Sequence, residues 1–346
     1  MNQEIYLGGR RIAADAPVFI VAEMSANHLQ DYDRAIEIIH AAKEAGADAI
    51  KLQTYTADTM TVDSDADCFI NKGGLWDGIK EYDLYKQAYT PWEWHAGLME
   101  EAKKCGLLCF SSPFDATAVD FLEELDAPAY KIASYEINDI PLIRRVAKLH
   151  KPVIFATGIA HLEDIERAMN VCREEGNEDV ILLKCVSAYP TPYEDANLTA
   201  MIELYDQFGL PVGLSDHTPG WECDVAATVL GAQVIEKHFT LDKSLPGPDQ
   251  KASLDPAEFA AMVLAVRHAE AALGDGHKHL TASEAPNKAI ARKSIVAARP
   301  IKKGEVFTAE NLTTKRPGDG ISPMRWYEVL GQAAKRDFAE DEKIEL

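Results

Sequence analysis

The chain has 346 residues, of which 47% are hydrophobic, and a formal net charge of −21. The length suits one large domain and one small domain, and the acidic charge argues against nonspecific binding to nucleic acid or to an anionic membrane. No apolar run approaches the roughly 20 residues of a membrane-spanning helix, and the N-terminus lacks a basic-then-apolar leader. Six scattered cysteines form no disulfide framework, so we expect free thiols in a cytoplasmic protein.

Eight short apolar runs alternate with longer amphipathic segments along residues 18–274. The runs are continuously apolar, which is typical of strands that are buried on both faces of a parallel sheet. They cover residues 18–23, 48–53, 107–112, 129–134, 152–157, 180–186, 211–216 and 233–238.

Helical spacing of apolar residues predicts a helix after each run. In residues 31–46, Ala35, Ile38 and Ala42 share one face, and Gly46 is placed to end the helix. Strict strand–helix alternation over about 250 residues predicts a (β/α)8 TIM barrel, with an open doubly wound sheet as the alternative. We assign the barrel to residues 1–274. The other predicted helices are 91–105, 115–125, 139–149, 161–175, 197–208, 220–230 and 255–274.

Three segments depart from this repeat. Residues 54–90 form a connection that is too long for a simple loop, and their Asp, Gly, Tyr and Trp content predicts a lid or substrate wall at the active face. Residues 275–288 read as a polar linker, and residues 289–346 as a small β-rich domain. Such a domain has a marginal core of its own, so we expect it to pack on the barrel or on another subunit.

Active sites of barrels form where the strands meet the following loops, and the predicted strands end in a ring of polar residues. Lys51 and Lys131 lie inside apolar runs, where an unpaired ammonium would be costly. With the hydroxyls of Ser112, Ser134 and Ser215 they predict a pocket for a phosphate and a carboxylate. The alternative is that both lysines form structural ion pairs.

Two histidines, His217 and His238, follow the last two predicted strands. If those strands are neighbours about 4.8 Å apart, both imidazoles could reach one metal ion, and Glu236 would point to the same side as His238. By ligand type, such a site suits Mn²⁺, Zn²⁺ or Fe²⁺. The alternative is that both histidines bind the substrate directly.

The order of several motifs resembles the sialic acid synthase family, and the C-terminal segments resemble its antifreeze-like, or SAF, domain. The family motifs are "IVAEMSANH" (20–28), "AGADAIKLQTY" (45–55), "SSPFD" (111–115), "YKIASYE" (130–136), "GLSDHT" (213–218), "VIEKHFTLD" (234–242) and "GPD" (247–249), and the SAF motifs are "ARKSIVAARPIKKGE" (291–305) and "KRPGDGI" (315–321). The resemblance implies condensation of phosphoenolpyruvate with a 2-acetamido sugar, release of phosphate, and dependence on a divalent metal. That metal is expected to be Mn²⁺, with Mg²⁺ or Co²⁺ as alternatives.

The resemblance also implies roles for individual residues. His217 and His238 would bind the metal. Arg316 would enter the barrel of a partner subunit and contact its sugar, which implies a domain-swapped homodimer. The catalytic candidates are Glu23, Glu136 and Asp249; the phosphoenolpyruvate-binding candidates are Lys51, Ser112, Lys131, Ser134, Ser187 and Ser215; the other sugar-binding candidates are Asn27, Gln53, Tyr189 and Gln250.

Within the family, "AEMSANH" (22–28) and "KIASYE" (131–136) resemble the pseudaminic acid synthase branch, whose sugar is 2,4-diacetamido-2,4,6-trideoxy-altrose. Ala156, Ser187 and Gln250 depart from the N-acetylneuraminate synthase pattern. The alternatives are an N-acetylneuraminate or legionaminate synthase, a metal-dependent pyruvate aldolase on the same fold, and a non-enzymatic sugar- or ice-binding protein.

Overall fold

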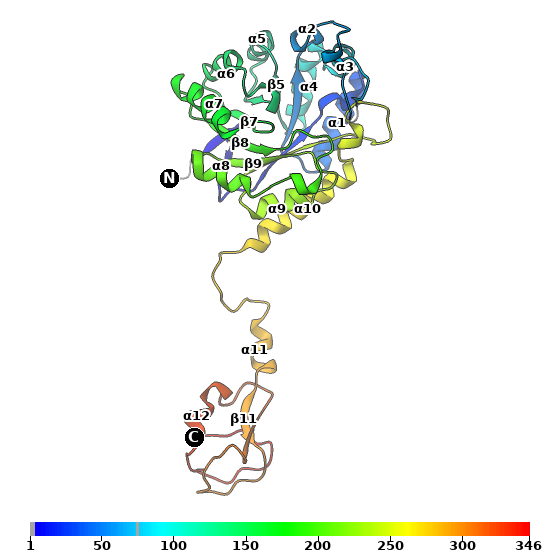
Figure 1. Ribbon diagram of the computed structural model, residues 1–346. Coiled ribbons are helices and arrows are strands. Elements are labelled where there is room, and N and C mark those ends of the chain that lie inside the picture. Colours follow the sequence, from blue (N-terminus) through cyan, green and yellow to red (C-terminus); the bar gives the residue numbers. More distant parts are fainter. Residues whose placement is uncertain (1–3, 74–75) are drawn as a thin grey trace. The chain divides into compact units, whose positions relative to one another are not determined.

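The computed structural model describes residues 4–73 and 76–346, and the chain divides into two compact units, with the boundary in the sequence between Gly274 and Asp275. Figure 1 colours the first unit from blue to yellow and the second unit from orange to red. In the described ranges, no helix has the length and apolar character needed to cross a membrane. All six cysteines are free, as the sequence predicts.

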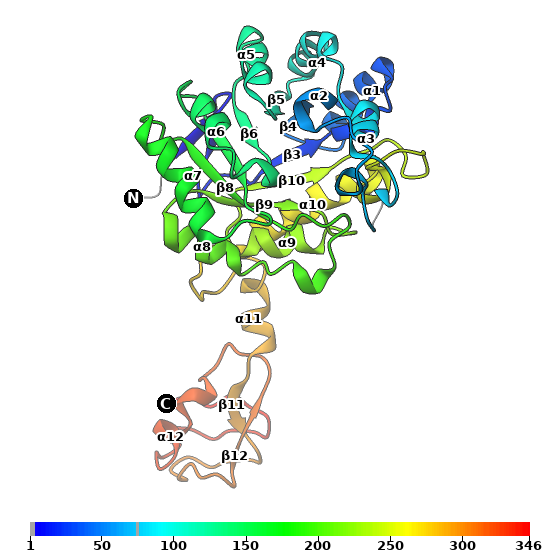
Figure 2. The same cartoon turned by 45° about the horizontal axis from the view of Figure 1, so that its top comes forward.

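The first unit is a closed barrel of eight parallel strands, so the predicted (β/α)8 fold is confirmed. The barrel closes where the last strand pairs with the first, for example Glu236 with Val21. Figure 2 labels the barrel strands except β7, which Figure 1 labels. Their bounds are β3 (Phe19–Glu23), β4 (Ala49–Thr54), β5 (Leu108–Pro113), β6 (Tyr130–Ile132), β7 (Val153–Ala156), β8 (Val180–Cys185), β9 (Val212–Asp216) and β10 (Val234–His238).

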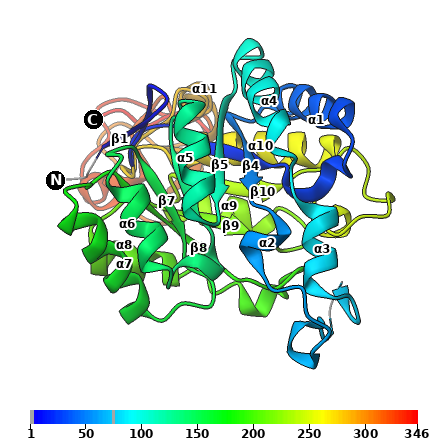
Figure 3. The ribbon, with the colours of Figure 1, turned by 90° about the horizontal axis from the view of Figure 1, so that it is seen from above.

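Helices surround the strands, as the view from above shows (Figure 3). Their bounds are α1 (Tyr32–Glu44), α4 (Trp92–Lys104), α5 (Ala116–Glu124), α6 (Ile140–Ala147), α7 (Leu162–Glu174), α8 (Ala200–Phe208), α9 (Glu222–Val229) and α10 (Pro256–Leu273). Side-chain hydrogen bonds at the N-terminus explain where several of these helices begin. Asp115 accepts hydrogen bonds from the first turn of α5, and Asp255 forms a capping box with Glu258 just before Pro256.

An N-terminal hairpin, β1 (Ile5–Leu7) and β2 (Arg10–Ile12), was not predicted. Its two turn residues, Gly8 and Gly9, have φ values of 53° and 85°, the left-handed conformation that a two-residue hairpin turn requires. Ile5, Leu7 and Ile12 are fully or almost fully buried against inward-facing strand residues such as Phe19 and Phe110. The hairpin therefore closes one end of the barrel, and a site can open only at the other end.

The long connection after β4 contains α2 (Ala57–Met60), a short 3-10 turn at Asp67–Phe69 and α3 (Glu81–Ala88). The indole Nε1 of Trp76 donates a hydrogen bond to the carbonyl oxygen of Pro248 at 3.2 Å. This bond joins the connection to the loop that follows β10.

The second unit has its own core. It contains α11 (Ala285–Ala291), an antiparallel pair of β11 (Ser294–Ala297) with β12 (Leu312–Lys315), and α12 (Trp326–Val329). Phe307 and Phe338 are buried in this core. Helix α11 begins inside the segment that we expected to be a linker, because Pro286 sits in its first turn and a helix-forming run follows.

Candidate active site

Alternation along the strands divides the barrel interior into layers. Val21, Ala49 and Phe110 point inward and fill the closed end together with the hairpin. Two residues further along their strands, Glu23 and Lys51 point into the same interior, because side chains on a strand alternate with period two. The charged layer therefore lies toward the open end of the barrel.

Four buried charges form one network in this layer. Lys51 Nζ lies 2.8 Å from Glu23 Oε2 and 3.2 Å from Glu236 Oε1, and Lys131 Nζ lies 3.3 Å from Glu236 Oε1. The four side chains expose between 1% and 6% of their surface, so almost no water screens these pairs. The ammonium groups are paired, as the structural interpretation of the lysines requires, and they also face the interior, so a role in anion binding stays a prediction.

Neighbouring hydroxyls complete the network. Ser215 Oγ donates to Glu236 Oε1 at 3.0 Å, and Lys51 Nζ donates to Ser112 Oγ at 3.4 Å. The Oε2 atom of Glu236 has no hydrogen-bond partner among the described residues. An anion that enters this layer would meet two ammonium groups and two hydroxyls that belong to one connected network.

The pKa values in the network follow from burial and pairing. Burial raises the pKa of Glu23 to about 7, although Lys51 opposes the shift. Burial also acts on Glu236, but Lys131 and Lys51 outweigh it and lower its pKa to about 2. Burial lowers the pKa of Lys131. Of the two carboxyls in the network, Glu23 is therefore the one whose pKa lies near neutral pH.

The predicted adjacency of the last two strands is confirmed, because β9 and β10 pair directly, with Ser215 opposite Glu236. The imidazole centroids of His217 and His238 are 5.3 Å apart. The Nδ1–H of His217 donates to the carbonyl oxygen of Val186 at 2.8 Å, which leaves Nε2 free as a ligand. His238 Nδ1 is buried without a hydrogen-bond partner among the described residues. These two imidazoles fit a divalent metal ion.

Glu236 does not complete this pair as a third ligand, because its carboxylate and the two imidazoles do not all have ligand atoms within 4.8 Å of one another. In the described ranges, the ligand atoms of one His, Glu and Cys group do lie within 4.8 Å of one another. That group, His40, Glu101 and Cys105, lies at α1 and α4 outside the barrel, and Lys104 also contacts Glu101. The remaining ligands at His217 and His238 would therefore be water or substrate.

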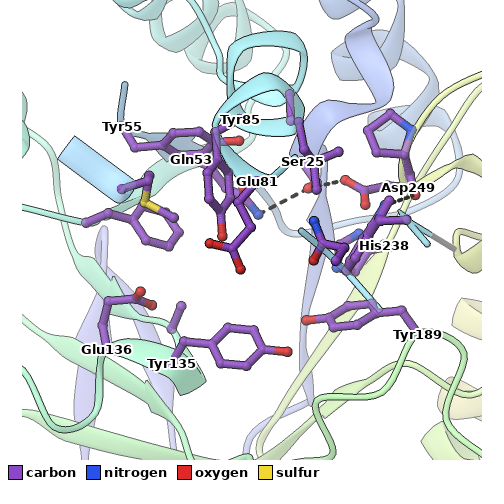
Figure 4. Close-up of a pocket in the computed structure, with 18 residues that line it drawn as sticks. Ser25, Gln53, Tyr55, Glu81, Tyr85, Tyr135, Glu136, Tyr189, His238 and Asp249 are labelled. Carbon is purple, nitrogen blue, oxygen red and sulfur yellow. Dashed lines mark hydrogen bonds between the residues drawn. The ribbon is translucent and has the colours of Figure 1, made fainter. Parts of the chain in front are cut away.

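A chain of hydrogen bonds links the charged layer to the loop after β10. Gln53 Nε2 donates to Glu23 Oε1 and to Ser25 Oγ, both at 3.1 Å. Ser25 Oγ donates to Asp249 Oδ2 at 2.5 Å. Figure 4 shows Ser25, Asp249 and His238 on one side of the cavity. The structure thus brings three candidates together through Ser25, which the sequence analysis missed.

A cavity of about 460 Å³ opens next to this chain. Tyr189 lies in its wall, with its ring centroid 4.2 Å from that of His217. Tyr135 and Glu136 form the edge opposite Tyr189 in Figure 4. Burial raises the pKa of Glu136 to about 7, and its Oε2 has no hydrogen-bond partner among the described residues.

Most of the remaining lining comes from residues that the sequence analysis did not single out. Eight of them belong to the long connection, whose composition predicts a wall but does not reveal which side chains face inward. These residues are Tyr55, Met60, Asn71, Trp76, Glu81, Leu84, Tyr85, Ala88, Phe114, Ala133, Tyr135 and Pro248.

Two sugar-binding candidates lie outside the lining. Asn27 is fully buried and donates to the carbonyl oxygen of Phe239 and to Ser253 Oγ. Gln250 is also fully buried, and its amide donates to the carbonyl oxygen of Asn27 at 3.5 Å. Their contacts brace the loops after β3 and β10 from within, which explains why neither faces the cavity.

Ser134 and Ser187 lie together around Gly158. The N–H of Gly158 donates to Ser134 Oγ at 3.1 Å, and a Cβ at this glycine would lie 2.3 Å from Ser187 Oγ. A side chain at position 158 would therefore displace both hydroxyls. Arg316, the last candidate, is exposed on the second unit.

Known families and proteins are similar to this chain over most of its length. Residues 38–278 match the NeuB family, and residues 292–345 match the SAF domain. A pseudaminic acid synthase of Campylobacter jejuni is 51% identical over 324 residues, which cover 94% of each chain. An N,N'-diacetyllegionaminic acid synthase of the same species is 42% identical and covers 94% of this chain and 98% of its own. A crystal structure of N-acetylneuraminic acid synthetase from Leptospira borgpetersenii superposes with a TM-score of 0.74 at 34% identity, covering 83% of this chain and 95% of that one.

Proposed function

The chain belongs to the NeuB family and carries a SAF domain, and from this premise we propose that it synthesises pseudaminic acid. It is a transferase of the kind that joins phosphoenolpyruvate to a sugar. The proposed sugar is 2,4-diacetamido-2,4,6-trideoxy-altrose. Identity of 51% to a pseudaminic acid synthase, against 42% to a legionaminic acid synthase, supports this choice.

The observation that favours a 6-deoxy diacetamido sugar over the precursor of N-acetylneuraminate is the apolar part of the cavity wall. Met60, Leu84, Tyr85 and Phe114 all line the cavity, and the rings of Tyr55 and Phe114 meet edge to face at 5.2 Å. A 6-deoxy sugar presents a methyl group at carbon six, and two acetamido groups present two more methyl groups. Burial of a methyl group against such a wall is favourable, whereas a hydroxyl there would lose its hydrogen bonds to water.

Phosphoenolpyruvate would bind in the charged layer beside this cavity. Lys51 and Lys131, with the hydroxyls of Ser112 and Ser215, offer charge-assisted donors to the phosphate and carboxylate. Ser134 and Ser187 would extend the same pocket around Gly158.

His217 and His238 would hold the divalent metal, with Mn²⁺ as the proposed ion and Mg²⁺ or Co²⁺ as alternatives. The bound ion would supply Lewis-acid polarisation of the sugar aldehyde. In the reaction, carbon three of phosphoenolpyruvate attacks the aldehyde carbon, and water adds at carbon two. Glu23 takes the proton of that water, a role that suits a carboxyl with a pKa near 7. The adduct then loses phosphate by cleavage of its C–O bond.

The sugar would lie between Tyr189, Gln53 and Asp249, with Glu136 opposite. We assign Arg316 to the cavity of a second subunit, so that the active form is a domain-swapped homodimer in the cytoplasm. The exposed position of Arg316 on the second unit is compatible with that assignment.

A panel of three sugars tests the proposal. The full-length protein is incubated with phosphoenolpyruvate, Mn²⁺ and the precursor of pseudaminate, legionaminate or N-acetylneuraminate, and both product mass and released phosphate are measured. We expect the pseudaminate precursor to react fastest and a chelator to stop the reaction. A faster reaction with another precursor would contradict the proposed sugar. Product formed from pyruvate without phosphate release would indicate an aldolase instead.

A further inference from the structure

Lys237 lies on the opposite side of β10 from Glu236 and His238. Its side chain is fully buried in the layer between the barrel and the helices. The ammonium group donates to Asp216 Oδ2, to the carbonyl oxygen of Thr218 at 2.7 Å and to that of Gly220 at 2.6 Å. All three of its donors are therefore used, as burial of a charged amine requires.

The acceptors of Lys237 all belong to one short segment, residues 216–220, which we call the 216–220 turn. Asp216 tightens the same turn, because it accepts hydrogen bonds from the N–H of Thr218 at 3.0 Å and from its hydroxyl at 2.8 Å. His217 is part of this turn, and its ring lies inside the barrel against Tyr189 and His238. The hydrogen bonds of Lys237 and Asp216, on the outer side of the strands, thus fix the backbone of the turn, and this backbone carries His217, whose ring lies inside the barrel.

We propose that Lys237 is a positioning residue that holds His217 at the spacing from His238 that a shared metal ion requires. The positions of both histidines then depend on one strand, since β10 carries His238 on its inner side and Lys237 on its outer side. Partners of metal ligands typically contribute 10- to 100-fold to metal affinity through such orientation. This inference rests on the proposed metal role of the two histidines.

A second carboxyl in the cluster provides a matched control. Asp224 of α9 is fully buried, its oxygens have no hydrogen-bond partner among the described residues, and Lys237 Nζ is 3.9 Å away. One ammonium group cannot compensate two buried carboxylates, so burial favours the neutral acid form of Asp224. Burial indeed raises the pKa of Asp224 well above its ordinary value. Asn at position 224 would keep the same shape and a donor.

The test measures Mn²⁺ affinity by isothermal titration calorimetry on full-length apoprotein. We expect Lys237→Met to weaken Mn²⁺ binding by about 10- to 100-fold. Phosphoenolpyruvate affinity should stay within about twofold, because the charged layer is untouched. Asp224→Asn should bind Mn²⁺ within about twofold of the unaltered protein. Unchanged Mn²⁺ affinity in Lys237→Met would overturn the inference.

Three further variants separate positioning from general stability and from the premise. Met262→Ala opens a cavity in the core near α9, and it should lower the melting temperature without changing Mn²⁺ affinity. Thr218→Val removes one hydrogen bond to Asp216 with little change of shape, so it should weaken Mn²⁺ binding by about fivefold even if Lys237→Met does not fold. Unchanged affinity in Thr218→Val would also count against the inference. Unchanged Mn²⁺ affinity in His217→Ala would refute the proposed metal role of His217. Loss of Mn²⁺ affinity in His217→Ala, with no loss in Lys237→Met, would refute only the positioning role of Lys237.

Discussion

Lys51 is held between two carboxylates, those of Glu23 and Glu236, in a space that water barely reaches. The two carboxylates raise its pKa to about 12 against the opposing effect of burial. A lysine in this setting is permanently charged, so the site keeps its positive charge whether or not substrate is bound. The same pairing makes the lysine important for stability as well as for binding.

Replacement of Lys51 by Met should destabilise the barrel by about 3–5 kcal/mol, because two buried carboxylates would lose their shared cation. Chemical unfolding followed by tryptophan fluorescence measures this loss. The double variant Lys51→Met, Glu23→Gln should recover part of the stability, since one uncompensated charge is removed. Equal losses in the single and double variants would contradict this account of the network.

Glu136→Gln should change how stability depends on pH. Burial raises the pKa of folded Glu136 from 4.5 to about 7, so between these values the folded state holds a proton that the unfolded state releases. Stability of the unaltered protein therefore falls as pH rises through this window, and the penalty is complete above pH 7. Gln cannot ionise, so the variant should be more stable at pH 8, by on the order of 2 kcal/mol, and the difference should vanish toward pH 4.5. Melting temperatures at pH 5 and pH 8 check this sign, and a difference that is the same at both pH values would refute it.

At the scale of elements, the barrel could be predicted because strands buried on both faces leave continuous apolar runs. The hairpin at Ile5–Ile12 escaped prediction because its strands have three residues each, too few for a periodic signal. Its Gly8–Gly9 turn between alternating apolar residues is the local signal that could have revealed it. Short elements are identified by their turns more readily than by their strands.

Strand order also explains which site residues could be predicted. Residues at strand ends, such as Lys51 and His238, follow from the barrel rule, because the fold alone brings those ends together. The partner of Lys131 could not be identified from sequence, since Glu236 is distant along the chain. Residues 54–90 lack a repeating period, so the inward direction of Tyr85 or Trp76 could not be predicted either.

Trp76→Phe tests whether the long connection helps to hold the sugar. The indole donates to the carbonyl oxygen of Pro248, and its ring centroid lies 5.8 Å from that of Tyr189. Phe keeps an aromatic ring but loses the indole N–H and its hydrogen bond, so KM for the sugar should rise about fivefold while KM for phosphoenolpyruvate is unchanged. Trp94→Phe serves as the control, because Trp94 packs against His28 and Tyr32 and does not line the cavity. A similar rise of KM in both variants would indicate a general loss of packing.

At the scale of the whole molecule, the two units contribute unequally to the proposed chemistry. The barrel unit contains every candidate residue except Arg316, and the second unit has a separate core of its own. Although the barrel is strongly acidic, its few buried cations can bind an anionic substrate. No described residue of the cavity lining is an arginine. An arginine supplied from elsewhere would therefore add a donor that the cavity lacks.

Mixing two inactive variants tests whether that arginine comes from a partner subunit. His217→Ala should disable the barrel site, and Arg316→Ala should disable the donated contact, so each variant alone should have little activity. In a mixed dimer with exchanged second units, one cavity receives both defects, whereas the other pairs an intact barrel with an intact Arg316. Random association makes about half of the dimers mixed, so co-expression should restore about a quarter of the unaltered activity. If Arg316 served its own barrel, every cavity in the mixture would carry one defect, and activity in the co-expressed sample would stay at the level of the separate variants.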